Sequence, residues 1–132
     1  METMTTRLVA AGVLFLITVL SGVWLSNSGR PLNSAIFTVH KLIAVATIVV
    51  IGISVYNLYR SLDLRTFIEL TVIAATALLF LALTVTGGML SLKELLPGPV
   101  LPAAALRVHQ VAPLLALVAS AATVYLLAGA KS

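Results

Sequence analysis

The stretch AIFTVHKLIAVATIVVIGISVYNLY, residues 35–59, decides the fold of this chain. Apart from Lys41 and one histidine near its start, it is almost entirely apolar. A helix needs about 20 apolar residues to cross the hydrocarbon core of a bilayer. Because lipid offers the backbone no hydrogen-bond partners, a helix is the conformation that pairs every N–H and C=O within such a segment. Residues 35–59 are therefore predicted to form a transmembrane helix.

Three further runs have the same character, at residues 8–25, 67–90 and 103–129. The segments between the four runs are SNSGRPLNS, RSLDLRT and SLKELLPGPVLP, which contain the polar, glycine and proline residues typical of loops. Short connections between helices favour antiparallel neighbours. We predict an all-α, integral membrane four-helix bundle with up-down-up-down topology, forming a single domain over residues 1–132.

The composition excludes a soluble class of protein. The chain is 61% hydrophobic and only 9% charged, whereas soluble domains average about 25% charged residues. It has no cysteine, which excludes disulfides, iron–sulfur clusters and thiolate metal sites. The net charge of +4 comes from residues near the ends of the runs. This distribution suits lipid head groups, so the predicted partner is a lipid bilayer, and no basic patch suggests nucleic-acid binding.

The basic residues also predict an orientation. One side of the membrane would hold Arg7, Arg60, Arg65 and Lys131, and the other Arg30, Lys41, Lys93 and Arg107. Lys41 and Arg107 lie inside the second and fourth runs, so we discount them. The positive-inside rule then places both termini in the cytoplasm. We expect the protein in a prokaryotic-type cell membrane.

The only two histidines, His40 and His109, occupy matching places in the second and fourth runs. They lie in FTVHKLIA and LRVHQVAP, each about six residues, or roughly 9 Å, inside its helix. An ionisable residue inside a membrane is a functional candidate. Haem iron accepts one nitrogen ligand on each face of the macrocycle, and four-helix bundles hold cofactors in this way. Structural hydrogen bonding, proton handling and another metal are the alternatives for these histidines.

Small residues occur at the depth of the histidines. The pair Ser21–Gly22 ends the first run, and Gly87–Gly88 ends the third. A backbone without a side chain allows a flat ring to approach closely, although close helix packing also uses glycine. A faint repeat accompanies these pairs, because TVLSGVWL and TVTGGML each precede a loop containing Gly and Pro and then a Val-His pair. The repeat predicts two similar helical hairpins.

Haem carries two propionates, which need cationic or polar partners near the membrane surface. The candidates are Lys41, Arg30 and Arg107, which all lie on the side of the histidines. The alternative for Lys41 and Arg107 is that they extend to lipid head groups. Pro113 follows His109 by four residues and cannot donate to its carbonyl, so a bend is expected near this histidine.

The motifs FTVHKLIA and LRVHQVAP, with glycine at the ends of the first and third helices, resemble the small four-helix membrane b-type cytochromes (cytochrome b561-like proteins). The resemblance implies noncovalent haem b ligated by His40 and His109, and electron exchange with a quinone or a redox protein. The members with two haems use four histidines, whereas this chain has two and can ligate one haem. It would act as an electron carrier or as a haem-dependent membrane oxidoreductase.

Two non-redox functions are the alternative, a small membrane transporter and a structural subunit of a membrane complex. Coupled transport usually needs an acid within the membrane. Glu69 is the only candidate, and its place at the start of the third run favours a helix cap or an ion pair with Arg65. The sequence is also compatible with an oligomer.

Overall fold

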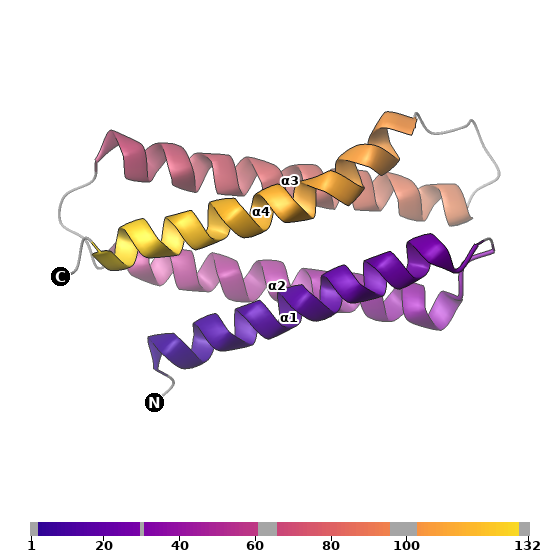
Figure 1. Ribbon diagram of the computed structural model, residues 1–132, viewed down its shortest axis with the longest axis horizontal. Coiled ribbons are helices and arrows are strands. Elements are labelled where there is room, and N and C mark those ends of the chain that lie inside the picture. The colour runs from indigo at the N-terminus through magenta and orange to yellow at the C-terminus, as the bar shows by residue number, and fades with distance from the viewer. Residues whose placement is uncertain (1–2, 30, 61–65, 96–102, 130–132) are drawn as a thin grey trace. The chain divides into compact units, whose positions relative to one another are not determined.

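The computed structural model describes residues 3–29, 31–60, 66–95 and 103–129. It contains four α-helices, α1 (Met4–Asn27), α2 (Ser34–Arg60), α3 (Phe67–Leu95) and α4 (Ala103–Gly129) (Figure 1). The described residues contain no strand, and all four helices are long and apolar enough to cross a membrane. The predicted all-α class is confirmed, and the four helices are consistent with a membrane bundle. The chain is an integral membrane protein.

Side-chain caps define where α2 and α3 begin. The Asn33 Oδ1 accepts hydrogen bonds from the backbone N–H groups of Ala35 (3.0 Å) and Ile36 (3.2 Å) at the start of α2. At the start of α3, the Thr66 N–H donates to Glu69 Oε2 (2.9 Å), and the Glu69 N–H donates to Thr66 Oγ1 (3.2 Å). This reciprocal pair is a capping box, which satisfies N–H groups that have no partner inside the helix.

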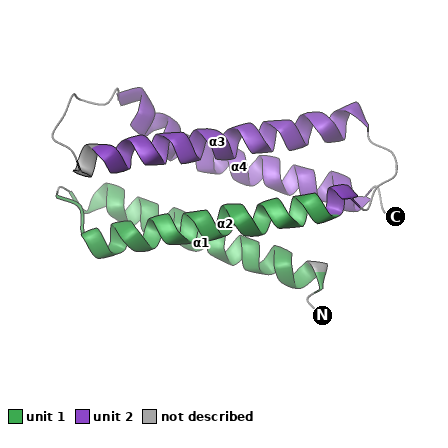
Figure 2. Cartoon of the chain, turned by 180° about the vertical axis from the view of Figure 1, so that it is seen from behind, with its two compact units in different colours: residues 1–57 green, residues 58–132 purple. Residues whose placement is uncertain are grey.

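The chain divides into two compact units, residues 1–57 and 58–132 (Figure 2). The first unit contains α1 and most of α2, and the second contains α3 and α4. Each unit is an antiparallel helical hairpin, because residues that come later in its first helix contact residues that come earlier in its second helix. The prediction that residues 1–132 act as a single domain stays a prediction.

A pair of threonines joins the two helices within each hairpin. Thr18 Oγ1 lies 3.2 Å from Thr47 Oγ1 in the first hairpin, and Thr76 Oγ1 lies 2.9 Å from Thr123 Oγ1 in the second. Thr47, Thr76 and Thr123 are buried. Interhelical hydrogen bonds of this kind stabilise helix pairs in a membrane, where hydrophobic attraction between helices is weak. The threonine pairs therefore help to fix how each hairpin is packed.

Helix α4 contains Pro113 in its interior. Proline has no N–H, so the His109 carbonyl four residues earlier lacks its usual donor. Figure 1 shows that α4 bends in its N-terminal part, as the sequence predicted. The proline thus influences the direction of the helical segment that carries His109.

Candidate functional site

In the first hairpin, His40 of α2 packs against the Ser21–Gly22 pair of α1. The Ser21 Oγ lies 2.8 Å from His40 Nδ1. A β-carbon added at Gly22 would stand 3.1 Å from His40 Cε1, which is closer than side chains normally pack. Glycine therefore provides the space that the half-buried imidazole occupies. Ser21, Gly22 and His40 form what we call the first half-site.

In the second hairpin, His109 of α4 has the same surroundings from α3. The Thr86 Oγ1 lies 3.0 Å from His109 Nδ1, and a β-carbon at Gly87 would stand 3.0 Å from His109 Cε1. The imidazole is half-buried, and Thr86 is buried. Thr86, Gly87 and His109 form the second half-site.

The two half-sites share the same hydroxyl and glycine contacts to the histidine. The residues that make these contacts are not the ones that the sequence repeat aligns. Alignment of TVLSG with TVTGG pairs Gly22 with Gly88. In the structure Gly87, not Gly88, contacts the histidine, and the position of a β-carbon at Gly88 has no atom within 4 Å. Successive residues on a helix differ by about 100° in direction, so only one of two adjacent glycines can face the imidazole. The structural repeat is therefore hydroxyl, glycine and histidine.

The helix faces that carry the histidines are buried further along α2 and α4. Side chains seven residues apart lie on nearly the same helix face. Starting from each histidine, every seventh residue is small or hydroxylic and buried, with at most 2% of its surface exposed: Thr47 and Ser54 on α2, and Ala116 and Thr123 on α4. Each histidine therefore belongs to a buried helix face and not to an isolated polar position on the surface.

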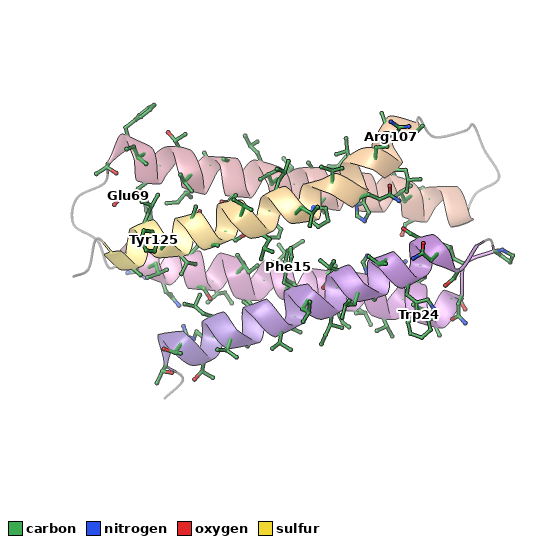
Figure 3. All side chains as sticks on the ribbon, in the orientation of Figure 1. Phe15, Trp24, Glu69, Arg107 and Tyr125 are labelled. Atoms are coloured by element: carbon green, nitrogen blue, oxygen red, sulfur yellow. The ribbon has the colours of Figure 1, made fainter. Side chains whose placement is uncertain are left out.

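The three basic residues considered as propionate partners have different positions. The Lys41 ammonium lies 4.4 Å from the centre of the Phe37 ring, one turn earlier on α2, and its side chain is exposed. This is a cation–π contact. Arg107 is exposed in the first turns of α4 (Figure 3). Arg30 lies outside the described residues.

Glu69 has the structural role that its position suggested. Its side chain is only 7% exposed and completes the capping box at the start of α3 (Figure 3). Within the described ranges, no three or more His, Cys, Asp or Glu side chains gather where they could hold a metal ion. The donor set of these residues does not match a zinc site, which needs three or four protein ligands.

Sequence reasoning found the histidines and glycines but missed the hydroxyl partners. Ser21 was noted only as a small residue, and Thr86 was not singled out. The available signal was a hydroxyl residue directly before a glycine near the end of both the first and the third run. In the structure these two hydroxyl residues, Ser21 and Thr86, are the ones that contact Nδ1 of the histidines.

Comparison with protein-family models, curated proteins and solved structures finds no match to this chain. The functional inference therefore depends on the geometry of the two half-sites.

Proposed function

We propose that this chain is a membrane b-type cytochrome that binds one haem b per chain and transfers one electron at a time. His40 and His109 would be the residues that hold the haem iron. The observation that supports this proposal is the repeated half-site, in which each imidazole rests on a glycine and contacts a hydroxyl through Nδ1. The chain contains no cysteine, so the haem would be held noncovalently.

The donor set suits haem better than other metal groups. The haem iron of electron-transfer cytochromes takes two protein ligands, and the chain has two histidines. A metal-ligating histidine usually uses its other ring nitrogen to bond an oxygen in the surrounding protein. With Nδ1 of each ring beside a hydroxyl, Nε2 is the nitrogen that would ligate. A histidine that only links two helices does not require the same glycine and hydroxyl twice.

The ligand set also favours electron transfer over oxygen chemistry. Haem, when bound, would supply a one-electron iron couple, and both histidines would ligate its iron. The half-sites would hold the ligands in place, and the apolar residues around them would limit access of water. The protein would then act as an electron carrier or as the haem subunit of a membrane oxidoreductase.

We propose a lipid-soluble quinone as the electron partner, although a redox protein is the other candidate. An apolar groove of about 400 Å³ lies between α1 and α2, with Leu20, Trp24, Ala35 and Val39 in its wall. Ser21 also lines this groove while its hydroxyl lies 2.8 Å from His40 Nδ1. A molecule dissolved in the bilayer could enter an apolar groove, and its ring would be one side chain away from a haem ligand.

A bulky side chain in this groove tests the partner. Ala35→Trp would fill the groove, and Ala104→Trp is the matched control, because both exposed alanines lie five residues before a histidine. Haem reduction by a short-chain quinol should be slower in Ala35→Trp than in Ala104→Trp, with the absorption spectra unchanged. Equal rates in the two variants would instead favour a protein partner.

The non-redox alternatives have less support. Glu69 takes part in a capping box, so it has a structural role at the start of α3. A purely structural subunit would need neither half-site. For orientation, we keep the proposal that both termini face the cytoplasm of a prokaryotic-type cell, with the histidines near the opposite surface.

Haem titration of the detergent-solubilised protein tests the proposed function. The wild type should saturate at one haem per chain. His40→Ala and His109→Ala should each lose the bis-histidine spectrum, whereas Thr38→Ala, two residues before His40 and exposed, should behave as the wild type. Because methionine also ligates haem iron, His109→Met should bind haem with a more positive potential. A wild type that binds no haem would refute the proposal.

A further inference from the structure

We infer that Ser21 and Thr86 are positioning residues that keep a proton on Nδ1 of each histidine and thereby set the reduction potential of the iron. The tautomer assignment stands on the hydrogen bonds alone. The effect on potential rests on the proposed function. Neither hydroxyl would touch the haem, so both would act through the imidazole that each one contacts.

In the first half-site, the Ser21 hydroxyl has two neighbours and a single proton. Its Oγ donates to the Thr18 carbonyl at 2.9 Å and lies 2.8 Å from His40 Nδ1. A carbonyl oxygen can only accept, and the serine has one proton. Both contacts of Ser21 are therefore hydrogen bonds only when its hydroxyl donates to the Thr18 carbonyl and the imidazole donates from Nδ1. His40 therefore carries its proton on Nδ1.

In the second half-site, the same reasoning applies to Thr86. Its Oγ1 donates to the Ala82 carbonyl at 2.7 Å and lies 3.3 Å from the Leu83 carbonyl, which leaves an acceptor for His109 Nδ1 at 3.0 Å. The contact with Thr86 Oγ1 therefore assigns the proton of His109 to Nδ1.

A neutral imidazole has one N–H and one lone pair. With the proton on Nδ1, the lone pair is on Nε2, and the ring is ready to ligate a metal without a proton shift. The glycine beneath Cε1 and the hydroxyl beside Nδ1 together restrict how the ring can turn. Donation from Nδ1–H makes the imidazole a stronger electron donor, which stabilises ferric iron and lowers the reduction potential.

The tautomers can be measured in the haem-free protein by ¹⁵N NMR, since the chain contains only two histidines. The wild type should show a protonated Nδ1 and an unprotonated Nε2 for both rings. Ser21→Ala and Thr86→Val, which remove the acceptor with little change in shape, should each shift one ring toward the other tautomer. Ser21→Thr and Thr86→Ser keep the hydroxyl and should retain the wild-type pattern. A wild type with the proton on Nε2 would overturn the assignment.

Potentiometric titration of the haem-loaded protein tests the effect of Ser21 and Thr86 on the reduction potential. Ser21→Ala and Thr86→Val should each move the midpoint to a more positive value, and the double variant should move it further because the two residues act on different ligands. Ser21→Thr and Thr86→Ser keep the hydroxyl, so their midpoint potentials should stay near that of the wild type. A purely structural role would not predict this result. Shifted tautomers with unchanged midpoints would overturn the redox role. A wild type that binds no haem would refute the proposed function but leave the NMR result to decide the tautomers.

Discussion

The ring of His109 lies so close to Gly87 that a β-carbon added at this glycine would stand 3.0 Å from His109 Cε1. Gly22 has the same relationship to His40, at 3.1 Å. In both hairpins the glycine is preceded by the hydroxyl residue that contacts Nδ1 of the same ring. Each hairpin therefore holds its histidine with one backbone contact and one hydrogen bond.

Alanine at these glycines should displace the histidines. Gly22→Ala and Gly87→Ala each insert a methyl group into the space of an imidazole, and overpacking of this kind costs about 1–3 kcal/mol. We expect haem affinity to fall by about tenfold or more, since 1.4 kcal/mol corresponds to a factor of ten. Haem titration of each variant measures the loss.

Two other glycines provide controls for that experiment. Gly88 is adjacent to Gly87, Gly52 lies on α2, and neither has an atom within 4 Å of its added β-carbon. Gly88→Ala and Gly52→Ala should leave haem affinity unchanged, because alanine is tolerated wherever space is open. If Gly88→Ala lowered haem affinity as much as Gly87→Ala, the contact between Gly87 and His109 would not be the cause of the loss.

The threonine pair of the second hairpin should stabilise the fold without affecting haem. Thr76→Val and Thr123→Val remove a hydroxyl pair at 2.9 Å. Interhelical hydrogen bonds in membranes contribute about 0.6 kcal/mol on average, so we expect a coupling energy of that order from a double-mutant cycle. Thr123 lies two heptads, roughly 21 Å, along α4 from His109, and the haem spectrum should not change. A coupling energy near zero would show that the hydroxyls are not paired in the bilayer.

The capping box at α3 should affect stability alone. Thr66→Ala should cost about 0.5–2 kcal/mol, as for other N-cap residues. Glu69→Gln keeps an oxygen that can accept from the Thr66 N–H, so it should cost less than Glu69→Ala. Unfolding of each variant in mixed micelles gives these differences. If Glu69→Gln abolished proton-coupled transport in vesicles while stability was retained, the transporter alternative would replace the cytochrome proposal.

Hydropathy predicted the membrane-spanning part of each helix but not the full helix. Helix α1 begins at Met4, four residues before the apolar run, because the Thr3 side chain caps it by accepting from the Thr6 N–H. Helix α3 continues to Leu95 through the more polar segment SLKEL. The length of an apolar run corresponds to the thickness of the hydrocarbon core. A helix can extend beyond that run as long as its backbone hydrogen bonds and caps are satisfied.

The candidate site could be predicted at the level of residues but not of contacts. The histidines were identifiable because they are the only imidazoles in apolar runs. Which glycine faces His109 depends on how α3 is rotated about its axis, and a change of one residue turns the face by about 100°. For that reason the sequence named both Gly87 and Gly88, and the structure brings Gly87 to the ring. The role of Thr86 depends on the same rotation.

The visible absorption spectrum of the purified wild-type protein, oxidised and then reduced, tests the central claim most directly. Haem should be supplied during expression, and His40→Ala and His109→Ala should be measured beside the wild type. Our account predicts a Soret band and sharp α and β bands on reduction, as expected of low-spin iron with two histidine ligands, and their loss in both variants. A colourless, folded protein that takes up no added haem would contradict it.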